Sequence, residues 1–138
     1  MPQVEGGLKL TAVRASAALT AAYVAGTVIK CGTVNHVTLG ISYAMGAGET
    51  ANSIEVKVEH KLYGGDGYYR KVNEADSTGT TTITLKEYTF AAVSAAETAD
   101  SFTLEIPVNC ESLKISVKET GKATNFGTCS ILANAGVK

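Results

Sequence analysis

The sequence predicts an all-β protein, an antiparallel β-sandwich or jelly roll folded as a single domain. Two runs, residues 37–43 and 54–62, alternate strictly between apolar and polar side chains, and small residues join them. Successive side chains of a strand point to opposite sides, so each run predicts a strand with one buried and one solvated face. Turn residues separate further runs of this kind at spacings of roughly 8 to 12 residues, which predicts about seven to nine short strands.

The first part of the chain is expected to contain strands that flank these two runs. Residues 8–14 alternate and predict an edge strand or an arm. Alanines in residues 15–25 would permit a helix, but apolar residues alternate there too, and β-branched residues follow at 27–29, so we expect strands. The predicted organisation is therefore an arm or edge strand over residues 1–14 and a sandwich over residues 15–138.

The middle of the chain predicts a hairpin and then an irregular strand. Gly64–Gly67 supplies glycines suited to the positive φ angles of a tight turn, and residues 68–72 are expected to return as the partner strand. Alternation resumes in residues 81–93, with a slip between Leu85 and Tyr88 that predicts a β-bulge.

The last third predicts the remaining strands. Residues 94–100 are small and are expected to form a loop or a single helical turn. A strand over residues 102–106 should end at Pro107, because proline cannot donate to a strand ladder. Further strands are expected at residues 113–117 and 126–133.

Composition limits the classes of partner. The chain has 138 residues and is 45% hydrophobic without tryptophan, which is enough for a core of small and β-branched side chains. Its net charge is −1, with lysines and acids interspersed, so we expect no nucleic-acid partner. The first residues lack the positive charge of a signal peptide, and residues 15–29 contain polar positions that argue against a membrane span. We therefore expect a soluble protein without a membrane partner.

The cysteines do not form a recognisable metal motif. Cys31, Cys110 and Cys129 are an odd set without a CxxC pair, and neither His36 nor His60 is close to one in sequence. We expect no metal and no cofactor, and the composition favours buried thiols in a protein made in a reducing cytoplasm. A disulfide bond between Cys110 and Cys129 is the alternative, because sequence alone does not fix the distance between them.

Two features resemble catalytic motifs but have simpler interpretations. The loop Gly64–Gly67 enters a strand, whereas a phosphate-binding loop of the GxxxxGK[ST] type opens a helix. A glycosidase needs two carboxylates that stand about 5 to 9 Å apart across a sugar. The candidates for such a pair are Glu55, Glu59, Glu87 and Glu105. Glu55 and Glu59 fall on the predicted solvated face together with Lys57, which favours a charged strand surface.

No residue is predicted to be catalytic. His60 is in phase with the inward residues near a strand end, which favours a partly buried histidine, and the chain has no GxSxG motif. The six tyrosines include Tyr43, Tyr63, Tyr68 and Tyr69. They could stack on sugar rings if they gathered on one surface, although core and interface positions are the more common role.

The order of segments resembles a known group of proteins. The segments are LTAAYVAGTVIKCGTVNHVTLGISYAMGAGETANSIEVKVEH (19–60), GGDGYYRKV (64–72), KEYTF (86–90) and FTLEIPVNCESLKISVKETGKATNFGTCSILA (102–133). This order is similar to that of small β-sandwich structural proteins encoded in the head-gene regions of tailed bacteriophages, of the capsid decoration or minor head type. Where those proteins commonly have a tryptophan after the turn, this chain has Tyr68–Tyr69.

The resemblance implies a virion structural protein that assembles in the host cytoplasm. Such a protein binds the major capsid protein or other virion subunits, often as a trimer, and reinforces the head. Residues 1–14 would then be the natural clamp, because a strand can add to the edge of a neighbour's sheet. Two other classes stay open: a carbohydrate-binding or receptor-binding surface module, and a polymerising subunit of the tail-tube or pilin kind.

Overall fold

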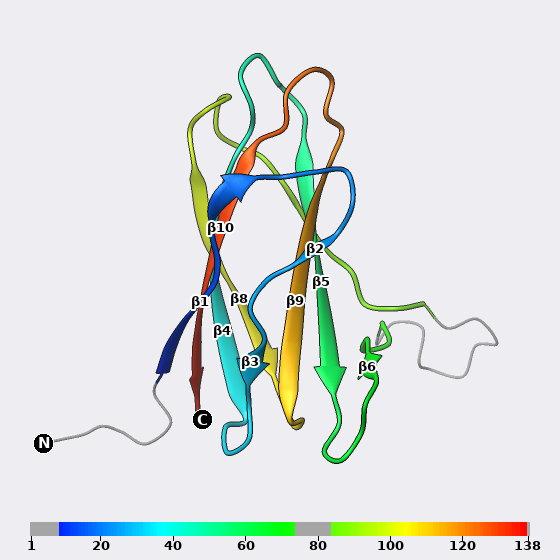
Figure 1. The fold of residues 1–138 in the computed structure, drawn as a ribbon. Helices are drawn as coiled ribbons and strands as arrows, with labels where there is room; N and C mark the ends of the chain where they lie inside the picture. Colours follow the sequence, from blue (N-terminus) through cyan, green and yellow to red (C-terminus); the bar gives the residue numbers. More distant parts are fainter. Residues whose placement is uncertain (1–8, 74–83, 138) are drawn as a thin grey trace, which may run out of the picture.

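The computed structural model describes residues 9–73 and 84–137 and shows a two-layer antiparallel β-sandwich, which confirms the predicted fold class (Figure 1). All elements in these residues are strands. They are β1 (Lys9–Ala18), β2 (Val24–Ala25), β3 (Ile29–Lys30), β4 (His36–Ala44), β5 (Ser53–Lys61), β6 (Tyr68–Tyr69), β7 (Tyr88–Ala91), β8 (Asp100–Pro107), β9 (Ser112–Thr120) and β10 (Thr128–Gly136).

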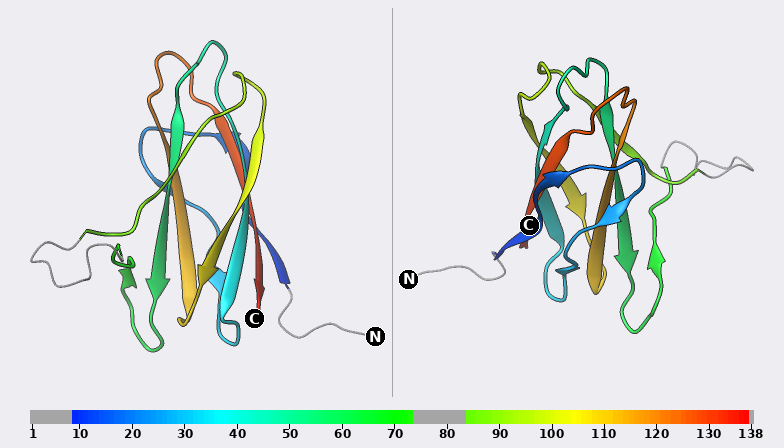
Figure 2. Two further views of the ribbon diagram at one scale, coloured as in Figure 1. Left: turned by 180° about the vertical axis from the view of Figure 1, so that it is seen from behind. Right: turned by 45° about the horizontal axis from the view of Figure 1, so that its top comes forward.

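The strands form two sheets. Sheet A has the order β1-β10-β4-β8, and sheet B has the order β2-β9-β5-β6, with β3 also paired to β9 and β7 also paired to β5. The chain crosses repeatedly from one layer to the other, so that β10 enters sheet A between β1 and β4. Figure 2 shows the two layers from two further directions, with several of the connecting loops at the two ends of the sandwich and the β1–β2 connection running across its side.

The core lies between the sheets and is made by the alternating residues. Val37, Leu39, Ile41 and Tyr43 of β4 are at most 1% exposed, and Ile54, Val56 and Val58 of β5 are buried as predicted. The predicted inward position of Leu62 is wrong, because the strand ends at Lys61 and Leu62 is 50% exposed. Strand β10 extends the inner surface of sheet A beside β4, and β9 extends that of sheet B beside β5. Their buried apolar residues are Leu113, Ile115, Val117, Cys129, Ile131, Ala133 and Ala135. Burial of these β-branched and aliphatic side chains is the main favourable term in the stability of such a fold.

The structure differs from the predicted strands in the first part of the chain. The strand predicted over residues 15–25 is wrong as a continuous element, because β1 ends at Ala18 and the chain then leaves sheet A. Leu19 turns into the core, where it is 2% exposed. The chain is held there by a hydrogen bond from the Leu19 N–H to the Gly127 carbonyl at 2.9 Å. Burial of one leucine thus outweighs continuation of the local alternation.

The predicted hairpin is present, but its second strand is short. Gly64 has a φ of 73°, as the predicted turn requires, and β6 pairs with β5 only through Tyr68 and Tyr69. A single bridge between Val72 and Leu85 follows. The prediction for residues 81–93 is confirmed for β7, and its first three residues lie outside the described part of the chain.

Candidate functional site

A buried carboxylate fastens two loops at one end of the sandwich. Glu49 lies in the β4–β5 connection and is 4% exposed. Its Oε2 accepts hydrogen bonds from the backbone N–H groups of Thr124 and Asn125 at 2.8 and 3.0 Å. Its Oε1 accepts from the Ala123 N–H at 2.7 Å and from Asn52 Nδ2 at 2.9 Å. One side chain therefore closes the β9–β10 loop against the β4–β5 loop.

A second carboxylate lies beside the first. Glu119 of β9 is 2% exposed. Its Oε2 accepts from the Tyr43 hydroxyl at 2.6 Å and from Asn52 Nδ2 at 3.3 Å. Its Oε1 accepts from the Gly127 N–H at 2.7 Å. Asn52 thus joins the two carboxylates into one network, which we call the carboxylate network (Tyr43, Glu49, Asn52 and Glu119).

The carboxylate network is built to brace loops. The oxygens of Glu49 and Glu119 all accept hydrogen bonds from the protein itself, as buried charged groups require. Burial and the hydrogen bond to Glu119 raise the pKa of Tyr43, so this hydroxyl stays protonated and acts as a donor. Sequence analysis did not single out either glutamate as a functional residue.

Acid is expected to loosen this end of the molecule through Glu49. The three backbone donors and Asn52 lower the pKa of Glu49 from 4.5 to about 2. A group whose pKa is lower in the folded than in the unfolded chain stabilises the fold above its unfolded pKa, and this contribution is lost as the pH falls through the folded value. The melting temperature should therefore fall between about pH 4.5 and pH 2.

Asp100 acts in the same direction, because a hydrogen bond from the Ser94 hydroxyl and the N–H groups of Val93 and Ser94 lower its pKa. Circular dichroism melts across this range check the prediction with Glu49→Gln, which should melt lower than the wild type at neutral pH and lose less on acidification. Glu87→Gln, at an exposed position, is the control. Equal pH profiles for the wild type and Glu49→Gln would contradict the assignment.

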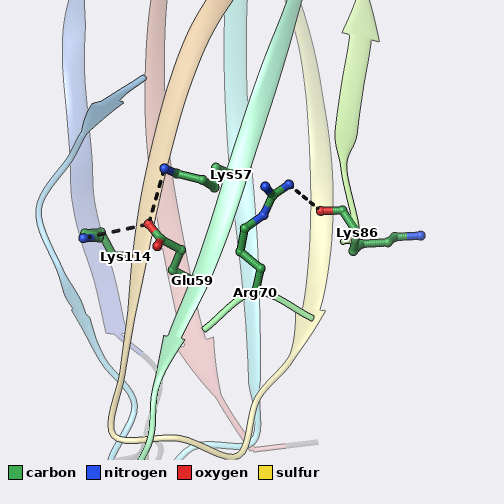
Figure 3. A network of polar contacts seen from close by, with 5 residues as sticks. All are labelled: Lys57, Glu59, Arg70, Lys86 and Lys114. Carbon is green, nitrogen blue, oxygen red and sulfur yellow. Dashed lines mark hydrogen bonds and ion pairs between the residues drawn. The ribbon is translucent and has the colours of Figure 1, made fainter. Parts of the chain in front are cut away.

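The outer face of sheet B carries the charged residues that the alternation predicted there. The Nζ atoms of Lys57 and Lys114 are each 3.8 Å from Glu59 Oε1 (Figure 3). Arg70, which follows β6, donates from Nη2 to the Lys86 carbonyl at 3.0 Å (Figure 3). Partly exposed ion pairs of this kind contribute little stability individually but keep a sheet face solvated.

Tyrosines cover part of the same face. The ring centre of Tyr23 is 4.6 Å from Lys57 Nζ and 4.7 Å from Lys118 Nζ. The ring centre of Tyr68 is 4.3 Å from Lys114 Nζ. These are cation–π distances, and each contact also shields the apolar part of a lysine.

The remaining tyrosines are spread over the molecule. Tyr43 is buried in the core, whereas Tyr63 and Tyr69 are 56% and 58% exposed near the β5–β6 hairpin. The Tyr63 hydroxyl donates to the Gly32 carbonyl at 2.9 Å. Burial keeps Tyr43 out of any platform of the kind that binds sugar rings, whereas Tyr63 and Tyr69 are open to solvent.

The acidic residues considered as a carboxylate pair are divided between the two sheets, with Glu55 and Glu59 on β5 of sheet B and Glu105 on β8 of sheet A. Glu55 accepts a hydrogen bond from the Tyr23 hydroxyl at 3.3 Å on the outer face of sheet B. Glu105 lies on β8 in the other sheet, where its Oε1 is 2.9 Å from His36 Nε2. Glu87 is exposed ahead of β7. His60 is half-buried, and burial, together with the charge of Lys71, lowers its pKa.

The outer face of sheet A is different in character. Strands β4, β8 and β10 present small side chains there, and large apolar side chains stand among them. We call this surface the docking face, and its members are Leu10, Thr38, Gly40, Ser42, Ser101, Thr103, Ser130, Leu132 and Asn134. Leu132 and Leu10 are 48% and 66% exposed. Two charged side chains on this side, His36 and Glu105, pair with each other at one end.

Three hollows run in a row along the docking face. The largest, about 340 Å³, includes Gly40 and Leu132 in its lining, and Leu132 is paired with Gly40 across the two strands. A second hollow of about 210 Å³ shares Gly40 and Leu132 with it. A third of about 230 Å³ lies at the His36 end and shares Thr38 and Asn134 with the second. Gly40 lacks a side chain, and the row of hollows runs past it.

The three cysteines are free and buried, as predicted. The structure does not bring Cys110 and Cys129 together. Cys129 is paired with Tyr43 near one end of sheet A, whereas Cys110 follows β8 at the other end and has Cys31 as its neighbour. In the described residues, no group of three or more histidine, cysteine, aspartate or glutamate side chains is placed to hold a metal ion.

Comparison with known proteins leaves the family open. No protein-family model matches the chain, and a search of curated proteins finds no significant match. Within residues 9–73 and 84–137 there is no helix of the length and apolar character needed to cross a membrane.

Proposed function

We propose that this chain is a non-enzymatic structural protein of a virion, of the capsid decoration type, which acts by docking onto its own copies and onto capsid subunits. The observation that carries the proposal is the contrast between the two outer faces. Sheet B presents lysine–glutamate pairs and tyrosine–lysine contacts. The docking face of sheet A instead presents small side chains around exposed leucines, with hollows beside them.

Such a face suits contact with another protein surface. Small residues let a second backbone or sheet approach closely, and exposed aliphatic side chains supply the apolar area that such an interface buries. The edge strand β1 adjoins this face, because Leu10 is paired with Asn134 of β10. The proposal also rests on the resemblance of the segment order to phage head proteins, and a trimer is the assembly that this resemblance favours.

The test compares two lysine substitutions at exposed apolar positions. Leu132→Lys places a charge in the middle of the docking face, whereas Val93→Lys changes a loop residue that is 88% exposed. We expect the wild type and Val93→Lys to form a discrete oligomer, with a trimer favoured, by light scattering and to sediment with heads of the phage that encodes the chain. Leu132→Lys should weaken both associations by at least about tenfold.

Three results would count against the proposal. A monomeric wild type that stays in the supernatant would contradict it, and so would retained binding by Leu132→Lys. An open polymer in light scattering would favour the tail-tube or pilin class instead.

A second candidate is a carbohydrate-binding module, because Tyr63 and Tyr69 are more than half exposed and the hollows of sheet A are lined by hydroxyl groups. A glycan array with the wild type and with Tyr69→Ala separates this candidate from the first. Binding to a glycan that depends on Tyr69, by a monomeric protein, would favour it.

A further inference from the structure

Two of the three cysteines lie next to each other in the core. Cys31 comes directly after β3, and its backbone N–H donates to the Glu111 carbonyl at 2.8 Å, which extends the pairing of β3 with β9 by one residue. Cys110 immediately precedes Glu111 in the chain. Both residues are buried, at 0% and 1% exposed, and each thiol is near enough to influence the pKa of the other. The fold therefore brings together two cysteines that are 79 positions apart in the sequence.

The third cysteine is remote from this pair. Cys129 is paired with Tyr43, and Pro107 is paired with His36, so the two positions are seven residues apart along β4. Seven residues of a strand span about 23 Å, far more than the roughly 7 Å between α-carbons that a disulfide tolerates. In this fold Cys129 cannot reach Cys110, which lies three residues beyond Pro107.

We propose that Cys31 and Cys110 form an intramolecular disulfide when the chain meets an oxidising small disulfide, and that Cys129 remains a thiol. The thiolate of one cysteine attacks the small disulfide RSSR, forms a mixed disulfide and releases one RS⁻, which takes up the proton lost by the cysteine. The second cysteine then attacks the protein sulfur of the mixed disulfide and releases the second RSH. In the balance, two protein thiols are oxidised to one bridge, and one RSSR is reduced to two RSH.

Burial decides when this exchange takes place. Burial, together with the neighbouring thiol, raises the pKa of Cys31 to about 12, and burial also raises the pKa of Cys110. Little thiolate is present in the folded chain at neutral pH, so attack from the closed core is slow. The exchange should proceed while the chain folds, when the thiols are still accessible and the native fold selects which of them come together.

The experiment is therefore a refolding experiment. Reduced, unfolded full-length protein is refolded in a buffer of oxidised and reduced glutathione, the remaining thiols are alkylated, and the peptides are mapped by mass spectrometry. We expect one bridge per chain, a loss of about 2 Da from the two hydrogens removed, with Cys31 linked to Cys110 and Cys129 alkylated. Cys129→Ser should give the same bridge, and Cys110→Ser should give no intramolecular bridge.

Other outcomes would overturn the proposal. These are three alkylated cysteines in the refolded wild type, a dominant bridge that includes Cys129, or a dominant bridge between two chains. If Cys110→Ser does not fold, the peptide maps of the wild type and Cys129→Ser still show whether Cys31 is linked to Cys110. The proposal does not depend on the proposed function, because the readout is the bond and not an assembly.

Discussion

Replacing Glu119 by alanine is expected to destabilise the fold by about 3 to 5 kcal/mol. The change removes the acceptor of the Tyr43 hydroxyl and of the Gly127 N–H, at 2.6 and 2.7 Å, and one partner of Asn52. Glu119 is 2% exposed, so water does not readily replace these partners, and the deletion also leaves a cavity. Urea denaturation followed by circular dichroism should show a lower midpoint with an unchanged slope.

Two controls separate the carboxylate network from a general effect of removing a charge. Glu111→Ala removes a carboxylate whose side chain is 37% exposed and 3.7 Å from Lys61 Nζ, and it should cost less than about 1 kcal/mol. Tyr43→Phe removes one donor and keeps the ring, and it should cost about 1 to 2 kcal/mol. A Glu119→Ala variant as stable as Glu111→Ala would contradict the bracing role.

Gly127→Ala is expected to cost about 3 kcal/mol, because the added methyl group meets backbone. A Cβ built at Gly127 would lie 2.1 Å from the Ala44 carbonyl oxygen and 3.0 Å from Glu119 Oε2. The carbonyl belongs to β4 and cannot rotate away as a flexible side chain would, so the strand or the β9–β10 loop must shift. Denaturation in urea measures the loss.

Gly32→Ala is the matched control for this substitution. A Cβ at Gly32 meets no atom within 4 Å. Its effect should stay within about 0.5 kcal/mol. Comparable losses for the two alanines would show that glycine flexibility, and not the close approach at Gly127, sets the cost.

Strand positions were largely predictable because the period of two is a local signal. The inward set of β4 and the inward set of β5 follow directly from the order of apolar residues. The same alternation places Glu119 at an inward position, in phase with the buried residues Leu113, Ile115 and Val117. A charged residue at an inward position predicts a buried partner, so this half of the carboxylate network could have been found.

The other half could not have been found from the sequence. The main partners of Glu49 are backbone N–H groups of residues 123–125, and backbone groups leave no mark in a residue pattern. The docking face could not be predicted from the sequence either, because its composition depends on which strands are neighbours. Alternation indicates that Gly40 points outward, but only the topology places Leu132 of β10 and Thr103 of β8 on either side of it. The contact between Cys31 and Cys110 likewise depends on how the turn before β9 lies against β3.

The position of β10 in sheet A has a consequence for biosynthesis. Strand β10 lies between β1 and β4, so residues 9–18 have their sheet partner only after residues 128–136 have been made. On the ribosome, β1 therefore has no sheet partner until residues 128–136 have been made, and Val13 and Leu19 are not fully enclosed before then. Because closing a loop over such a separation is slow, the pairing of β1 with β10 should be a late step in the folding of sheet A.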